Sequence, residues 1–323
     1  MADRTSIEWT DATWTPIKGC TRKSPGCVNC YAEIMAARFS KEGQWGEGLA
    51  TIVETPQGKD HRWTGAVRLD DNELLKPLSW RKPRRIFVCS TSDLFHEAVS
   101  FDDIDLVFAV MNRARHHTYQ VLTKRPDRMR EYIKSRTRLP DEIGAFYDLP
   151  TDGSVTLYQP LRNVWLGTSV EDQPRADERL AVLRDTPACT RFVSFEPMLG
   201  PITADLQGIH WAIVGGESGP GARPMHPDWA RSLRDQCSAA NVPFLFKQWG
   251  DFISVFDRDV DDPDWRRCGS WEDTHPKGRW HNLAGGTGFH GERVVYVDRV
   301  GKKRAGRLLD GLQHDGYPEV HHG

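Results

Sequence analysis

The sequence predicts an α/β protein: a parallel (βα) barrel or partial TIM barrel of about six to eight strands, with an inserted loop and a small C-terminal extension. Short apolar runs rich in β-branched and aromatic residues alternate with stretches of helical periodicity. Two runs, 86–88 and 212–214, are apolar without alternation, which is typical of strands buried on both faces. Polar residues follow nearly every run, as they do at the carboxyl rim of a parallel barrel.

The predicted elements follow one another over residues 1–250, the expected barrel. A faint first strand is expected at 13–18, and a helix at 31–38. Further strands are predicted at 85–89, 118–123, 163–168, 191–195, 211–214 and 243–247. Further helices are predicted at 101–115, 126–135, 174–184 and 227–240.

Two segments break the alternation. Residues 40–83 hold several glycines and tryptophans, among them Trp45 and Trp63, with weak periodicity, which predicts an inserted loop or lid. Residues 251–323 are polar and loop-rich, and 293–298 with 301–306 predict a β-hairpin. We expect this C-terminal extension to pack on the barrel.

Three cysteines in one short run form the most specific motif. Cys20, Cys27 and Cys30 have no fourth cysteine or histidine close by in sequence to complete a tetrahedral zinc set. A structural zinc wants four protein ligands, whereas an iron-sulfur cluster on three cysteines leaves one iron open. The turn at 24–26 and the helix from residue 31 place the motif in a loop that leads into a helix.

A zinc site remains an alternative, with Cys89 or His96 as a distant fourth ligand. A disulfide framework is disfavoured, because the chain has seven cysteines, an odd number, and is long enough to fold without cross-links. No signal peptide is recognised, so we expect reduced thiols and a cytoplasmic protein.

Composition indicates a large enzyme rather than a small binding module, since 323 residues can bury a sizeable core. The net charge of −2 gives no overall electrostatic reason to bind nucleic acid, although local basic clusters occur. No apolar run approaches the length of a membrane span, so no membrane association is expected.

The polar residues after the predicted strands would meet at one rim and form an active site there. Helix capping explains some of them one by one, but not the carboxylates and the lysine together. The rim residues of this kind are Glu171, Glu196, Glu217 and Lys247.

At this point the chain resembles a known family. The motifs that carry the resemblance are WTPIKGC (14–20), SPGCVNCYA (24–32), PRRIFV (83–88), SDLFH (92–96), VLTKR (121–125), NVWLG (163–167), EPMLGP (196–201) and VGGESGPGAR (214–223). They look like the three-Cys-motif family of phage and prophage proteins of undefined function, over nearly the whole chain. That family in turn resembles the radical S-adenosylmethionine enzymes, and the layout is similar to spore photoproduct lyase.

The resemblance implies a four-iron four-sulfur cluster on the three cysteines, with S-adenosylmethionine bound to the open iron. The usual motif of these enzymes spaces its cysteines by three residues and then two, whereas here the gaps are six and two. The implied chemistry is reductive cleavage to a 5'-deoxyadenosyl radical, which abstracts hydrogen from a substrate.

The same resemblance assigns cofactor contacts to the rim. Ser90, Ser92 and Asp93 would accept from the cofactor's ammonium, and Lys124 or Arg125 would bind its carboxylate. Thr168, Ser169 and Glu171 would contact the ribose. The Gly-Gly-Glu triplet that ends in Glu217 usually follows an early strand in these enzymes, so its position here is either a coincidence or a substrate contact. From the rim pattern, Glu196 and Lys247 complete the catalytic set. Cys89, at the end of a core strand, is a candidate hydrogen-atom donor, although a buried cysteine is more often a small hydrophobic residue.

The expected partners are a nucleic-acid base or nucleotide as substrate, an electron donor such as flavodoxin or ferredoxin, and a phage- or prophage-encoded protein. Trp45, Trp63 and the basic run 81–85 would stack on and follow a strand, although lid or core packing is the ordinary role of a tryptophan. Two alternatives from other classes remain: a zinc-binding nucleic-acid-binding protein without radical chemistry, and a metal-dependent barrel hydrolase that uses the rim glutamates.

Overall fold

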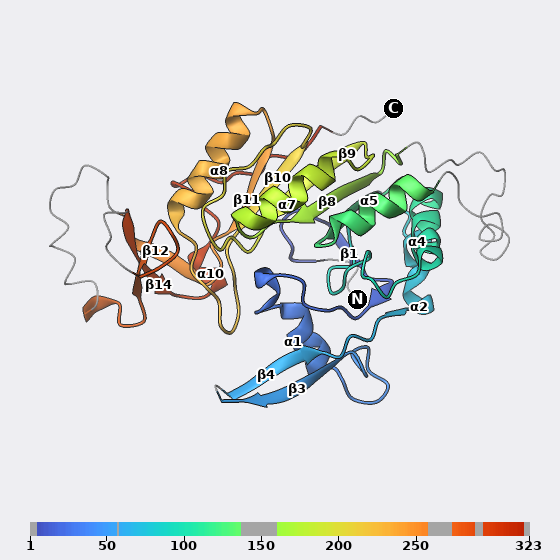
Figure 1. Ribbon diagram of the computed structural model, residues 1–323, viewed down its shortest axis with the longest axis horizontal. Helices are drawn as coiled ribbons and strands as arrows, with labels where there is room; N and C mark the ends of the chain where they lie inside the picture. Colours follow the sequence, from blue (N-terminus) through green and yellow to red (C-terminus); the bar gives the residue numbers. More distant parts are fainter. Residues whose placement is uncertain (1–4, 57, 137–159, 258–272, 288–292, 320–323) are drawn as a thin grey trace. The chain divides into compact units, whose positions relative to one another are not determined.

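A computed structural model describes residues 5–56, 58–136, 160–257, 273–287 and 293–319 (Figure 1). Cysteine 268 and the tryptophans at 265 and 271 lie outside these ranges. The chain divides into two compact units: residues 1–168 with 181–192, and residues 169–180 with 193–323. This division does not coincide with the predicted boundary at residue 250 between the barrel and the C-terminal extension. That domain boundary stays a prediction.

Seven strands form one sheet in the order β1-β6-β7-β8-β9-β10-β11. Their bounds are Ala12–Trp14, Arg85–Val88, Thr118–Thr123, Val164–Ser169, Thr190–Phe195, Trp211–Gly215 and Phe244–Gln248. The strands follow sequence order, and the four pairs with a described register are parallel. The predicted α/β class and strand number are confirmed. Among the described residues β1 and β11 are edge strands, so the sheet is open and a closed barrel is not formed.

The helices lie close to their predicted positions. They are α1 (Tyr31–Arg38), α4 (Phe101–Arg113), α5 (Pro126–Ser135), α7 (Gln173–Arg184) and α8 (Pro227–Ala239). Helix α8 packs on β10 and β11. Pro126 and Pro227 each stand at the first helical position, where the missing N–H costs no hydrogen bond.

In place of the single strand predicted at 13–18, the chain forms two short strands, β1 and β2. β1 pairs with β6 in the main sheet, whereas β2 (Ile17–Lys18) pairs with β5 (Arg68–Leu69) in a separate antiparallel pair. Pro16 lies between β1 and β2, and a proline has no N–H to donate to a ladder.

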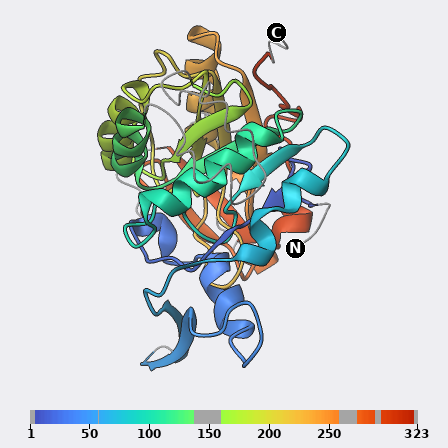
Figure 2. The same cartoon turned by 90° about the vertical axis from the view of Figure 1, so that its right-hand side faces the viewer.

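The expected inserted loop at 40–83 contains regular structure. β3 (Ala50–Thr55) and β4 (Gly58–Trp63) form an antiparallel hairpin, and two short helices follow, α2 (Asp71–Leu74) and α3 (Lys76–Ser79). The hairpin lies beside α1 in both views (Figures 1 and 2). Trp45 and Trp63 pack against a small core that includes Ala36 and Leu49, so their role here is packing.

The predicted C-terminal hairpin is wrong in its pairing. β14 (Val294–Arg299) pairs antiparallel with both β12 (Phe252–Asp257) and β13 (Arg279–Asn282). Residues 302–305 instead form a short helix, α10 (Lys302–Ala305). The glycines on either side, Gly301 and Gly306, have φ of 85° and 72°, a conformation that lets the chain turn out of the extended path.

Gly167 in β8 allows a close approach that no larger residue would permit. A Cβ there would lie 2.6 Å from the ring of Phe192, which is fully buried. We expect Gly167→Ala to lower the free energy of unfolding by about 1–3 kcal/mol through overpacking. Gly200→Ala is the matched control, because its Cβ would meet nothing within 4 Å. Urea unfolding of both variants measures the difference, and equal stability would show that Phe192 can move away.

Candidate functional site

The cysteine loop begins directly after β2. Gly19 has φ of 91°, and a Cβ there would lie 2.1 Å from the carbonyl oxygen of Ala66, so only glycine fits. The chain then turns through a short 3-10 helix at Pro25–Cys27, and Cys30 is the residue before the first turn of α1. The predicted turn and the predicted helix start at the third cysteine are confirmed.

The three thiols lie close enough together to influence one another electrostatically. Burial, the Asp93 carboxylate and the other two thiols raise the pKa of Cys20 to about 12, while Arg125 opposes them. Burial also raises the pKa of Cys30, although backbone N–H groups of α1 donate to its sulfur. Without a bound cation, both groups are therefore neutral thiols at pH 7. A metal would have to displace their protons.

The three thiols are soft donors, which both zinc and iron-sulfur clusters take. Among residues 5–319 as described, no three Cys, His, Asp or Glu side chains are arranged to hold one metal ion. The Lys23 N–H lies 3.5 Å from the Cys27 sulfur, and such N–H contacts to the sulfurs are common at iron-sulfur sites.

A buried ion-pair network adjoins the loop. Arg125, only 5% exposed, donates to the Asp93 carboxylate at 3.0 Å and to Glu97 at 2.6 Å. Its other nitrogen donates to the hydroxyl of Thr21 at 2.8 Å, and Thr21 follows Cys20 directly. Burial lowers the pKa of Arg125, but the two carboxylates outweigh it and the net shift is upward. Arg125 therefore stays charged and holds the start of the cysteine loop.

Both carboxylate oxygens of Asp93, the predicted acceptor for the cofactor's ammonium, already accept hydrogen bonds within the protein. One oxygen accepts from the Thr123 hydroxyl at 2.7 Å and from the Phe95 N–H at 3.0 Å. The other accepts from Arg125 and from the Lys124 N–H at 3.2 Å. The predicted ligands Asp93 and Arg125 are thus joined to each other, and Arg125 links this pair to Thr21 in the cysteine loop.

The other predicted cofactor contacts in the first unit, Ser90, Ser92 and Lys124, differ in whether their polar groups already have partners within the protein. The Ser92 hydroxyl donates to the Ile17 carbonyl at 2.7 Å, and the Ser90 carbonyl accepts from Tyr31, which follows Cys30. Lys124 is half-buried and close enough to Cys30 to oppose the upward shift of that thiol's pKa. Each predicted cation therefore acts on one cysteine of the motif, Lys124 on Cys30 and Arg125 on Cys20.

Neither proposed fourth zinc ligand is available as it stands. His96 is buried, its Nε2 lies 2.9 Å from the Thr21 hydroxyl, and its Nδ1 accepts from the Ala98 N–H at 3.1 Å. Cys89 is buried at φ of 58°, and Ser92 and the Ile17 backbone hydrogen-bond to its thiol. Either side chain would have to give up a hydrogen bond to ligate a metal.

Burial raises the pKa of Cys89 to about 11 and that of Cys237 to about 12. Because the thiolate is the reactive form, we expect iodoacetamide at pH 8 to label the exposed Cys189 first. Cys89 and Cys237 should react only on unfolding, as peptide mass spectrometry would show. Labelling of Cys89 at the rate of Cys189 would mean that this thiol is open to reagents.

The predicted ribose contacts are buried and engaged. The Thr168 hydroxyl donates to the Thr123 carbonyl at 2.9 Å. In the second unit, Arg179 donates to the Ser169 carbonyl at 2.8 Å and pairs with Glu171 at 3.2 Å. Glu171 is 0% exposed, so this pair is part of the packing around α7.

The remaining catalytic candidates, Glu196, Glu217 and Lys247, belong to the second unit, and each of the two carboxylates pairs with a cation. Lys247 donates to both oxygens of Glu196, at 2.7 and 2.9 Å, and the two side chains are 16% and 20% exposed. Glu217 is more buried, at 6%, and Arg223 holds both of its oxygens. Of these carboxylates, Glu196 is the one most open to a ligand.

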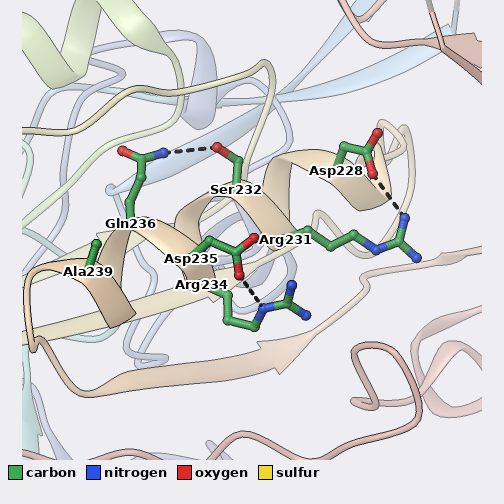
Figure 3. Close-up of a pocket in the computed structure, with 7 residues that line it drawn as sticks. All are labelled: Asp228, Arg231, Ser232, Arg234, Asp235, Gln236 and Ala239. Carbon is green, nitrogen blue, oxygen red and sulfur yellow. Dashed lines mark hydrogen bonds and ion pairs between the residues drawn. The ribbon is translucent and has the colours of Figure 1, made fainter. Parts of the chain in front are cut away.

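The hollow in Figure 3 is separate from all of these residues. It measures about 610 Å³ and is lined by α8 side chains, among them Asp228, Arg231 and Arg234. Both arginines pair with neighbouring carboxylates, including Asp310 at 2.7 and 2.6 Å. None of the predicted site residues lines it, and its charges are already matched.

Sequence reasoning missed Thr21, Glu97 and the buried pair of Glu33 with Arg22. Glu33 is 1% exposed, accepts from Arg22 at 2.6 Å and from the Trp63 N–H at 2.7 Å, and so ties α1 to β4. These partners lie 11 to 104 positions apart in the chain, and no local pattern announces them. The polarity of Glu33 within an otherwise apolar face of α1 was the available signal.

The fold and the cysteine loop define the class: an α/β protein with an open parallel sheet and a three-thiol loop near its first strand. The chain belongs to the family described as "Protein of unknown function (DUF5131)", whose model matches residues 4–318. Comparisons with curated proteins and with solved structures gave no match. Every helix in the described part of the chain is too short or too polar to cross a bilayer.

Proposed function

We propose that this protein is a radical S-adenosylmethionine enzyme whose cluster is held by Cys20, Cys27 and Cys30. The observation that carries the proposal is the convergence of three thiols in one loop, with the neighbouring Cys89 and His96 engaged elsewhere. Bound there, a four-iron cluster would supply the electron that cleaves S-adenosylmethionine to methionine and a 5'-deoxyadenosyl radical.

The chain's own residues give this site its shape and charge. Lys124, which acts electrostatically on Cys30, would offset the negative charge that three thiolates bring and would pair with the carboxylate of the cofactor. Arg125, fixed by Asp93 and Glu97, holds Thr21 and so limits the movement of Cys20. Glu33 fixes α1 against β4, which keeps Cys30 at the start of that helix.

The substrate proposed is a nucleic-acid base or nucleotide, for repair or modification. It would be recognised through Glu196, Glu217 and Lys247, of which the Glu196–Lys247 pair is the accessible one. A carboxylate and an ammonium side by side present an acceptor and a donor, which suits the mixed edge of a base. We further propose that the enzyme is cytoplasmic and takes its electron from a donor protein such as flavodoxin or ferredoxin. A phage- or prophage-encoded protein is the other proposed partner.

The test is cofactor cleavage. The protein is purified without oxygen, reconstituted with iron and sulfide, reduced with dithionite and given S-adenosylmethionine, and 5'-deoxyadenosine is quantified by mass spectrometry. We expect deoxyadenosine to form in proportion to protein. A fully iron-loaded protein that yields none would overturn the proposal.

A further inference from the structure

An exposed apolar stripe runs from the cysteine loop along α1. Val28, Tyr31, Met35 and Phe39 are 49%, 51%, 39% and 36% exposed. The last three are spaced by four residues and therefore lie on one face of the helix. The other face of α1 is buried against the core under the hairpin. Large apolar side chains grouped in this way mark an interaction surface.

The residues around this stripe are basic. Between residues 20 and 41 the chain carries Arg22, Lys23, Arg38 and Lys41 but one acidic residue, Glu33. Glu33 is buried and paired with Arg22, so the exposed charges of this segment are Lys23, Arg38 and Lys41. Glu97, which pairs with Lys23 at 3.5 Å, is also held by Arg125. An acidic surface would complement this rim.

The stripe reaches into the cysteine motif itself. Val28 lies between Cys27 and Cys30, and Tyr31 follows Cys30 directly. A protein seated on the stripe would therefore stand next to the thiolates. Small interfaces with an apolar centre and a charged rim are typical of transient electron-transfer complexes.

We propose that this stripe is the docking surface for a small acidic protein that carries one electron on a flavin or an iron-sulfur centre. The inference rests on the proposed function, which requires one electron from outside: the donor is oxidised by one electron, and the group on the three thiolates is reduced by one. A nucleic-acid strand is the competing occupant, because Tyr31 and Phe39 offer rings on which bases stack whereas Val28 and Met35 offer none, so the experiment below also measures binding of single-stranded DNA.

The experiment measures binding of a bacterial flavodoxin to the cluster-loaded protein by calorimetry, at low and at high salt. We expect Met35→Glu to weaken binding at least about tenfold, because a carboxylate enters an apolar contact and faces an acidic partner. Arg38→Glu should weaken it mainly at low salt, where steering charges act. Leu312→Glu is the control, since Leu312 is 64% exposed and lies in the other unit.

The rate of cluster reduction, followed by visible absorption, separates the two proposals. Reduction by flavodoxin should slow in Met35→Glu and Arg38→Glu, while reduction by dithionite stays unchanged. Equal flavodoxin binding by wild type and both variants, or no binding by the wild type, would overturn the docking surface. Loss of single-stranded DNA binding in these variants with flavodoxin binding intact would do the same. A wild type that forms no cluster would instead count against the proposed function.

Discussion

Cys27→Ala is expected to lose most of its iron after anaerobic reconstitution and to form no 5'-deoxyadenosine above background. A cluster on three thiolates has no spare protein ligand, and the nearest other candidates, Cys89 and His96, are held by hydrogen bonds of their own. Iron and sulfide assays with the visible spectrum measure the first effect, and mass spectrometry of the reaction measures the second.

Cys189→Ala is the matched control, because Cys189 is exposed and its thiol donates to the Pro160 carbonyl, outside the cysteine motif. It should keep the iron content and the activity of the wild type. Full iron loading and cofactor cleavage in Cys27→Ala would mean that the motif is not the ligand set.

Arg125→Met is expected to lower the free energy of unfolding by about 3–5 kcal/mol, the usual cost of leaving one partner of a buried ion pair behind. Asp93 is 5% exposed and would lose its buried cation, while its hydrogen bonds from Thr123 and two backbone N–H groups remain. The Thr21 contacts are lost as well, so Cys20 should become mobile and cofactor cleavage should fall.

Arg130→Met is the comparison, because Arg130 pairs with two carboxylates that are 62% and 54% exposed. Its cost should be within about 1 kcal/mol, as for other surface pairs. Urea unfolding of the two variants gives the difference directly. Equal effects would indicate that the Arg125 network contributes no more than a surface salt bridge.

Local sequence signals predicted the elements whose boundaries have local causes. Helix α5 begins at Pro126 and ends at Ser135 as predicted, because the proline fixes its first turn and its apolar residues recur with helical spacing. The strand predicted at 301–306 was wrong. Gly301 and Gly306 adopt positive φ and cap the two ends of the short helix α10, so the chain does not continue as a strand there. Whether the sheet closes into a barrel depends on the tilt and stagger of the strands, and the pattern of apolar residues does not specify either.

The candidate site was predictable to the same extent. The cysteines, their turn and the helix behind them are neighbours in the chain, and the sequence located them correctly. The sequence did not show which polar rim residues remain accessible to a ligand, because that depends on ion pairs with arginines. Arg179 pairs with Glu171, and Arg223 pairs with Glu217. The contact of Arg125 with Thr21 spans 104 positions and has no local signal.

The most direct test of the account is the metal content of the protein purified without oxygen. The account predicts a brown protein with about four iron atoms and four sulfides per chain after reconstitution, most of them lost in Cys27→Ala. A colourless protein that carries one zinc per chain and takes up no iron would contradict it, and would leave the three cysteines as a structural zinc site.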